Sequence, residues 1–339
     1  MHMKLLAGIA GFALVAAACG DESNEVSDAG DPVAATAPDT ATSPGTTPVP
    51  ETTVVPDTTT APETTAPATI HAPESTSPPA DELAIVSLSP TLTEMVFAIG
   101  AGDDLVAVDE FSTYPPEALD LPHELSGYEP NVEAIAGYEP DVVLISGDFT
   151  GLGDQLEPLG IELWDGPAAV TLNDTYDQIG ALGELTGHVD EAAALVAQMR
   201  SDIDTIIADL PEPAEPLTYY HELDPELYTV TSNTFIGSVY SLVGLENVAD
   251  AAADETDYPQ LNAEYLVESN PDLIFLADTK CCGESLDTVS ARPGWDSIAA
   301  VQTGSVIEMD DDIASRWGPR IVDYLHAVVD AVADVRAST

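Results

Sequence analysis

Hydrophobic and polar positions recur in one pattern at two places in the chain. The polar markers Asn-x-Glu and then Pro-Asp precede a continuous apolar run with identical spacing, beginning at Asn131 and again at Asn262. Asn suits a helix N-cap, Glu suits the first turn, and Pro-Asp ends the helix. An apolar run bounded by turn residues is typical of a buried parallel strand. The repeat predicts two similar α/β lobes around a cleft, which favours a binding protein; chance likeness between two ordinary αβ units is the alternative.

Helical patterns surround these copies. Ser89 and Pro90 suit the N-cap and first residue of a helix that Gly100 ends. A helix is predicted over 173–186, and apolar residues then recur at helical spacing until Leu210, where prolines follow. We therefore predict an N-terminal lobe over 83–172, a helical linker over 173–214 and a C-terminal lobe over 215–339.

The first 82 residues follow a different pattern. Lys4 precedes an apolar run that is too short to span a bilayer and matches the core of a secretory signal. Its end, Ala16-Ala17-Ala18-Cys19, resembles the lipobox of bacterial lipoproteins, in which Cys19 is lipidated; a plain signal peptide over 1–19 with an incidental Cys is the alternative. Residues 20–82 are rich in Thr, Pro, Ala and acidic residues, and they predict a disordered tether.

The large negative charge of the chain narrows the classes of partner that it can bind. The chain carries 61 acidic and 7 basic residues, a formal net charge of -54, with no Lys or Arg between Lys4 and Arg200. Nucleic acid and anionic lipid surfaces would be repelled, so we exclude them as partners. A solvated acidic surface suited to salty surroundings is the expected explanation, rather than recognition of a cationic ligand. The adjacent Cys281 and Cys282 predict a vicinal disulfide, with free thiols or a soft-metal contact as alternatives.

Three motifs together resemble a known family. Ser87-Leu-Ser-Pro-Thr-Leu-Thr-Glu94, the stiff aromatic loop from Phe111 to Pro116 and the first repeat are similar to periplasmic receptors of iron-chelate and cobalamin ABC importers. Cobalamin-binding receptors are the nearest match, and the resemblance covers essentially all of the chain after the tether. It implies the helical-backbone (class III) fold, in which two α/β lobes with mainly parallel central sheets are joined by one long helix.

The densest candidate segment runs from Asp310 to Arg320. Its two arginines either neutralise neighbouring carboxylates or donate hydrogen bonds to oxygens of a large chelate. The resemblance implies that Asp312 and Arg316 line the cleft beside Trp317, and that three further aromatic residues line it as well, although Ser146 replaces one family aromatic. These three are Phe111, Tyr128 and Tyr258.

The resemblance also implies that Glu133 and Glu264, one from each lobe, dock on arginines of the two permease subunits. No His pairing typical of a metal cage occurs, so we expect no metal site and no resident cofactor. His221 follows an expected strand and is a candidate axial ligand, which keeps haem as an alternative cargo.

Other classes of protein fit the sequence less well than a receptor does. The chain has no phosphate-binding glycine loop, no Gly-x-Ser-x-Gly elbow and no His-Glu-x-x-His helix, so we do not expect an enzyme. A stalked surface interaction module would explain the tether but not the segment from Asp312 to Arg320. We expect a monomeric receptor on the outer face of the cell membrane, anchored only by lipid, that delivers a cobalamin-like corrinoid to an ABC permease dimer. Haem and a ferric siderophore are the alternative ligands.

Overall fold

The computed structural model describes residues 83–208, 210, 215–253 and 256–338. The expected signal peptide, Cys19 and the tether lie outside these residues, as does most of the segment that follows Ala208. Within the described chain, no helix has the length and apolar character that a bilayer crossing requires.

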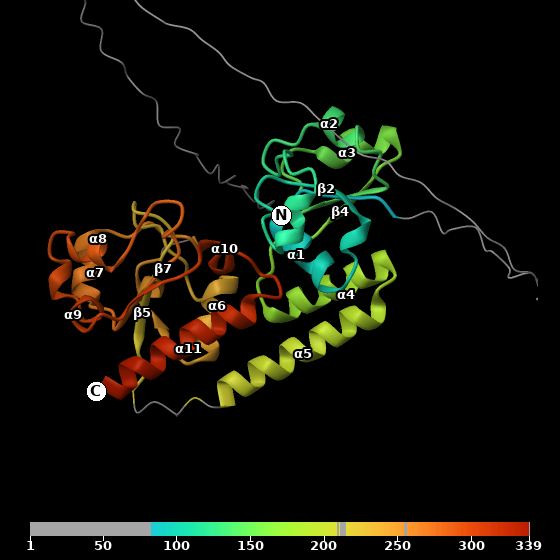
Figure 1. Ribbon diagram of the computed structural model, residues 1–339. Helices are drawn as coiled ribbons and strands as arrows, with labels where there is room; N and C mark the ends of the chain where they lie inside the picture. Colours follow the sequence, from blue (N-terminus) through green and yellow to red (C-terminus); the bar gives the residue numbers. More distant parts are fainter. Residues whose placement is uncertain (1–82, 209, 211–214, 254–255, 339) are drawn as a thin grey trace, which may run out of the picture. The chain divides into compact units, whose positions relative to one another are not determined.

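The N-terminal lobe is built on a four-stranded parallel sheet with the order β2-β1-β3-β4 (Figure 1). Its strands are β1 (Ile85–Ser87), β2 (Leu105–Val108), β3 (Val142–Ile145) and β4 (Glu162–Asp165). Its α-helices are α1 (Pro90–Ala98), α2 (Val132–Ala136) and α3 (Leu152–Leu156), with 3-10 turns at η1 (Gly102–Asp104), η2 (Pro116–Asp120) and η3 (Glu157–Leu159). The predicted cap of α1 is confirmed, because the Ser89 hydroxyl accepts from the Leu92 N–H.

The C-terminal lobe repeats this topology with the order β6-β5-β7-β8, again all parallel. Its strands are β5 (Thr218–Glu222), β6 (Glu246–Asn247), β7 (Leu273–Leu276) and β8 (Val306–Glu308). Its helices are α6 (Phe235–Leu242), η4 (Val248–Ala251), α7 (Ala263–Ser269), α8 (Leu286–Ser290), η5 (Trp295–Ser297), α9 (Ala299–Thr303), α10 (Asp311–Ala314) and α11 (Ile321–Ser338). The prediction of two similar α/β lobes is therefore confirmed.

The repeated polar markers have the same structural role in both lobes. Asn131 caps α2 and Asn262 caps α7 through side-chain oxygens that accept backbone N–H groups. The aspartate of each Pro-Asp pair then accepts a backbone N–H from the beginning of the neighbouring strand, from Ala84 in one lobe and Thr218 in the other, both at 2.9 Å. In each lobe this aspartate thus fixes the start of one central strand against the neighbouring strand.

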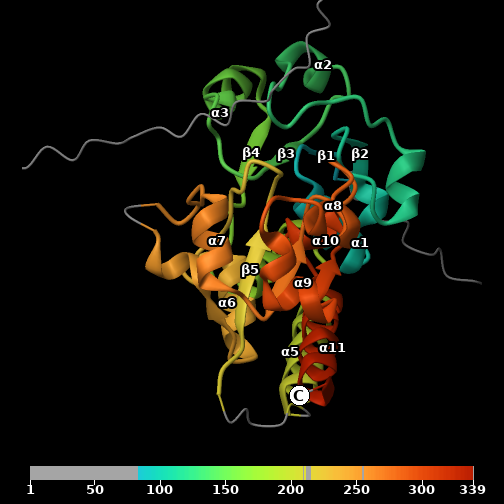
Figure 2. The same cartoon turned by 90° about the vertical axis from the view of Figure 1, so that its left-hand side faces the viewer.

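Two helices connect the lobes in the chain, α4 (Leu172–Thr186) and α5 (Val189–Ala208). Thr171 and Asp174 form a capping box at the start of α4, and Gly187 with φ 77° makes the turn into α5. At 20 residues, α5 is about 30 Å long. It lies beside α11 in both views (Figures 1 and 2).

One apolar core extends through both lobes. It joins Leu92 of α1, Ile203 of α5, Tyr240 of α6 and Tyr324 of α11 into one cluster of buried side chains. Smaller clusters cover the opposite face of each sheet. Because α5 and α11 pack on each other within this shared core, separation of the lobes is limited to motions that keep these helices in contact.

A buried polar cluster lies at the carboxyl ends of β5 and β7. Arg292 forms a bidentate pair with the buried Glu222, both bonds at 2.6 Å, and a further bond to Glu284 at 2.7 Å. Asp278 is fully buried beside them, and neither of its carboxyl oxygens has a hydrogen-bond partner among the described groups. Burial, with repulsion from Glu222 and Glu284, raises the pKa of Asp278 to about 8.

The free energy of unfolding should therefore depend on Asp278 between pH 4 and pH 8. The folded state keeps the proton up to about pH 8, whereas the ordinary aspartate pKa is 3.8, so rising pH favours the unfolded chain. Relative to the unsubstituted protein, Asp278→Asn should gain on the order of 5 kcal/mol between pH 4 and pH 8 in denaturant unfolding. Asp296→Asn, which removes an exposed carboxylate, should show no such gain. Equal pH profiles for both variants would contradict the prediction.

Candidate functional site

A pocket lies where the strand ends of the N-terminal lobe meet the C-terminal lobe. Its volume is about 370 Å³, and we call it the interlobe pocket. Ligands of open α/β sheets bind at the carboxyl ends of strands, and those of β1, β2 and β3 lead into it. It is lined by residues 88–91, Asp109, Phe111, Gly127, Tyr128, residues 145–147, Phe149, Asp312 and residues 315–317.

Aromatic side chains form the walls and the rim of this pocket. Phe111 and Tyr128 meet edge to face, with ring centroids 5.9 Å apart. Tyr128 is 76% exposed and Phe149 93% exposed, so apolar surface faces solvent beside the opening. Trp317 is held by a hydrogen bond of 3.0 Å from its Nε1 to Gln178 of α4. Exposed aromatic faces of this kind suit a broad, flat ligand.

The lobes are joined behind this pocket by buried ion pairs that we call the Glu94 bridge. Glu94 of α1 is buried, and its carboxylate accepts from Arg316 Nη1 at 2.6 Å and from Arg320 Nε at 2.9 Å. Arg316 Nη2 also donates to Asp312 Oδ1 at 2.9 Å and to the Phe111 carbonyl at 3.0 Å. The guanidinium of Arg316 thus donates to oxygens of both lobes.

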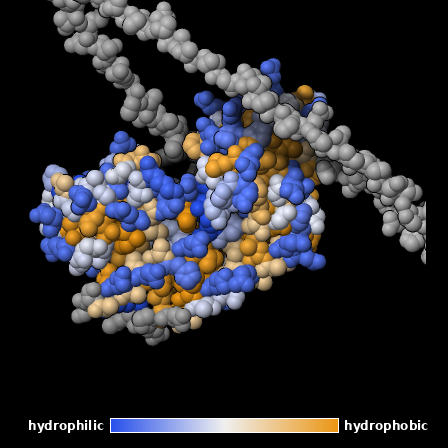
Figure 3. Space-filling view, in the orientation of Figure 1, coloured by the Kyte–Doolittle hydropathy of each residue, from blue (hydrophilic) through white to orange (hydrophobic). Residues whose placement is uncertain are grey.

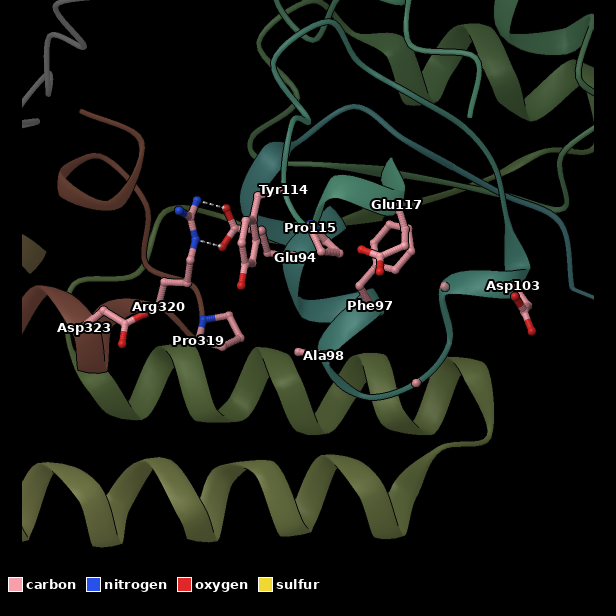
Figure 4. Close-up of a pocket in the computed structure, with 12 residues that line it drawn as sticks. Glu94, Phe97, Ala98, Asp103, Tyr114, Pro115, Glu117, Pro319, Arg320 and Asp323 are labelled. Carbon is pink, nitrogen blue, oxygen red and sulfur yellow. Dashed lines mark hydrogen bonds and ion pairs between the residues drawn. The ribbon is translucent and has the colours of Figure 1, made fainter. Parts of the chain in front are cut away.

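Arg320 immediately precedes α11, where the helix dipole disfavours a cation. Its guanidinium lies 4.1 Å from the ring centroid of Tyr114 and faces the Glu94 carboxylate (Figure 4). Burial alone would lower the pKa of Arg320, but hydrogen bonding to Glu94 and nearby carboxylates outweigh it and raise the pKa. Glu94 therefore explains why two of the chain's few cations occur in one short segment.

A second pocket lies on the other side of the bridge, with a volume of about 610 Å³. Figure 4 shows Phe97, Pro115, Pro319 and Asp323 around it. It is larger than the interlobe pocket, yet it adjoins the carboxyl end of α1 and the start of α11 instead of the strand ends. We therefore take the interlobe pocket as the candidate ligand site.

Hydrophilic residues cover the junction of the lobes on the face shown in Figure 3.

Asp109 is the buried carboxyl group of the interlobe pocket. It follows β2, is 2% exposed, and its Oδ1 has no hydrogen-bond partner among the described groups. Burial raises the pKa of Asp109 to about 6, against the opposing effects of Ser112 and Arg316. Gly127 packs against it: a Cβ there would lie 3.2 Å from Asp109 Oδ2 and 2.4 Å from the Leu88 carbonyl, so glycine is required.

The structure brings most of the predicted ligand residues together. Phe111, Tyr128, Asp312, Arg316 and Trp317 all line the interlobe pocket. Tyr258 does not, because its half-exposed side chain lies in the loop before α7, outside the pocket lining. Ser146 does line it, and its hydroxyl lies 2.6 Å from that of Ser89.

The prediction that His221 reaches the cleft is wrong. Its side chain points into the core, where Nδ1 bonds the Tyr240 hydroxyl at 2.9 Å. Complete burial lowers the pKa of His221 to about 3, so the ring is neutral. No group of three or more His, Cys, Asp or Glu side chains suited to a metal occurs among the described residues.

Cys281 and Cys282 are exposed free cysteines in this structure, in place of the predicted vicinal disulfide. Burial and the neighbouring thiol raise the pKa of Cys281 to about 12. Lys280 beside them pairs with Asp310 and Asp312, at 2.6 and 2.9 Å. Glu133 and Glu264 are exposed in the first turns of α2 and α7, one in each lobe.

Three residues of the site were missed in the sequence: Glu94, Asp109 and Phe149. Glu94 carried a detectable signal, because it is a lone carboxylate directly before the apolar run that begins at Met95. Asp109 and Phe149 follow strands, which is a usual place for ligand contacts, but nothing in their neighbours marks them.

Glu94→Ala should destabilise the protein strongly, because it leaves the buried guanidinium of Arg316 and the partly buried one of Arg320 without their shared partner. We expect a loss of about 3–5 kcal/mol in the free energy of unfolding, measured with denaturant. Glu133→Ala removes an exposed carboxylate and should change it by less than about 0.5 kcal/mol. A small effect of Glu94→Ala, similar to that control, would show that the bridge does not hold the lobes together.

Comparison with known proteins places these features in a family. A model described as "Periplasmic binding protein" matches residues 85–313. An uncharacterised ABC transporter substrate-binding lipoprotein of Bacillus subtilis, YvrC, is 31% identical over 73% of this chain and 79% of its own length. A cobalamin-binding protein of Halobacterium salinarum is 30% identical over 73% of this chain and 68% of its own.

A similar solved structure is the apo form of the periplasmic haem-binding protein RhuT from Roseiflexus sp. RS-1, with a TM-score of 0.66. It is 23% identical, and the match covers 75% of this chain and 99% of that protein. At this identity the likeness concerns the fold alone.

Proposed function

The chain belongs to the periplasmic binding protein family, and we propose that it is an extracytoplasmic receptor that captures a cobalamin-like chelate for an ABC importer. The family binds solutes. The observation that carries the proposal is the interlobe pocket, where strand ends of one lobe and the segment from Asp312 to Trp317 of the other form a single aromatic-rimmed site. Its ligand would be bound and released unchanged.

Pocket size indicates how such a ligand would fit. At about 370 Å³ the pocket is at the lower end of the roughly 300–1,000 Å³ usual for small-molecule sites. A corrinoid is broader than this, so we propose that one edge enters between the lobes while its flat face lies on Tyr128 and Phe149. Polar groups of that edge would meet Asp109, Asp312 and the oxygens around Arg316.

Anchoring and delivery complete the proposal. The lipobox-like sequence ending at Cys19 supports attachment by lipid to the outer face of the cell membrane, with residues 20–82 as the tether. Glu133 and Glu264 are exposed carboxylates at equivalent positions of the two lobes, suited to two separate contacts with a permease dimer. A monomer would place one of them over each permease subunit.

Direct titration tests the ligand. Cyanocobalamin, haemin and a ferric siderophore would each be added to purified protein, with binding followed by equilibrium dialysis and visible absorption. We expect one-to-one binding of cyanocobalamin. Phe111→Ala should weaken it about tenfold, since an aromatic contact contributes about 1–1.5 kcal/mol.

Leu119→Ala is the matched control, because Leu119 and Phe111 are similarly exposed, 48% and 47%, but Leu119 lies outside the pocket. Its affinity should be unchanged. Binding of haemin or the siderophore alone would replace the proposed ligand, and retention of none of the three would overturn the receptor proposal.

Docking is tested separately from binding. Glu133→Ala combined with Glu264→Ala should leave affinity for cyanocobalamin intact, because neither residue lines the pocket, while uptake falls in cells that carry the cognate permease. Glu51→Ala combined with Glu63→Ala removes the same charge from the tether and should transport normally. If the two double variants transport equally well, the docking role is untenable.

A further inference from the structure

The positive charge of the interlobe pocket is already paired with carboxylates of the protein. Arg316 is the cation among the described lining residues, and its guanidinium already donates to Glu94, Asp312 and the Phe111 carbonyl. Asp312 is likewise occupied, because it accepts from Arg316 through one oxygen and from Lys280 through the other. A ligand that carries carboxylates would therefore have to compete with Glu94 and Asp312 for this cation.

Asp109 differs from both of these residues. It is almost completely buried, and its Oδ1 has no partner among the described groups. The surrounding backbone fixes its position: its carbonyl accepts the Ser112 N–H at 3.1 Å, it bridges to Leu125 in parallel register, and Gly127 closes over Oδ2. The backbone of Asp109 is thus held in place, and its carboxylate packs against Gly127.

We propose that Asp109 is a specificity-determining residue that selects a ligand edge carrying amide N–H donors and rejects an edge carrying carboxylates. The inference rests on the proposed receptor function and names the chemistry that the pocket reads. A primary amide donates a charge-assisted hydrogen bond to the unpaired oxygen. A carboxylate in the same place brings a like charge into a desolvated site and leaves both groups without a donor.

The chemistry of the candidate ligands differs in this respect. The rim of a corrinoid carries several primary amides, whereas haem carries two carboxylates and no amide. A hydrogen-bonding site discriminates strongly against a ligand that leaves its buried polar group unpaired. Asp109 therefore favours the corrinoid over haem. This preference does not depend on aromatic stacking, because both macrocycles can stack on the aromatic side chains.

Matched ligands test the inference most directly. Affinities would be measured for cyanocobalamin and for each derivative in which one rim amide is hydrolysed to a carboxylate. The unsubstituted protein should bind at least one derivative about tenfold or more weakly than cyanocobalamin. In Asp109→Asn that same ratio should fall to within about threefold, mainly through tighter binding of the derivative.

Asp103→Asn is the control, because it removes an exposed carboxylate from the second pocket beyond the Glu94 bridge. It should keep the full ratio. An unchanged ratio in Asp109→Asn, or equal affinity of the unsubstituted protein for every derivative, overturns the role of Asp109 while leaving the receptor function intact. Absence of cyanocobalamin binding to the unsubstituted protein overturns the proposed function and this inference with it.

A second measurement needs no substitution. The charged groups around Asp109 are Arg316 and the carboxylates of Glu94 and Asp312 that Arg316 binds. Asp109, whose pKa is about 6, gains a proton between pH 7.5 and pH 5.5, while an exposed ligand carboxylate with a pKa of about 4–5 stays largely ionised. The affinity ratio should shrink over this range, and a constant ratio would contradict the inference.

Discussion

A carboxylate buried between two lobes is the constraint on which the site depends. Glu94 comes from the first helix of the N-terminal lobe, and both of its partners come from the segment before the last helix of the chain. Such a charge is tolerated in the interior only when it is paired and hydrogen-bonded. The pairing fixes the segment from Asp312 to Arg320 against the strand ends, and it separates the interlobe pocket from the larger pocket behind it.

The need to pair buried carboxylates also determines where the basic side chains lie. Lys280, Arg292, Arg316 and Arg320 all pair with carboxylates, and the guanidinium of Arg200 lies over the ring of Tyr176. Four of the seven basic residues are therefore placed where buried or clustered carboxylates need them, in a chain with 61 acidic residues. Among the described residues that line the interlobe pocket, the cation Arg316 is thus already paired with carboxylates.

Local patterns predicted the fold well. Three of these patterns depend only on neighbours in the sequence. They are the helix caps at Asn131 and Asn262, the buried apolar runs after each Pro-Asp, and the helical spacing that corresponds to α5. The site was harder to predict, because its central contact joins Glu94 and Arg316, which are 222 positions apart. Asp312 and Arg316, four residues apart, came from the family resemblance, and the structure pairs them.

The remaining errors of sequence prediction concern the direction in which a side chain points or a loop runs. Both faces of the sheet that contains β5 are covered, so alternation along this strand does not reveal which face its side chains meet, and His221 proved to be a core residue bonded to Tyr240. Tyr258 and Phe149 both lie in loops, whose paths are not set by periodicity. One lies outside the interlobe pocket and the other forms its rim.

Hydrogen–deuterium exchange with and without cyanocobalamin tests most directly whether the ligand enters on the strand-end side of the Glu94 bridge. We expect slower exchange around Tyr128, around Ser146 and Phe149 and around Asp312 to Trp317, with no change from Phe97 to Asp103. Slower exchange confined to Phe97 to Asp103 and the start of α11 would place the ligand in the pocket behind the bridge and contradict binding in the interlobe pocket.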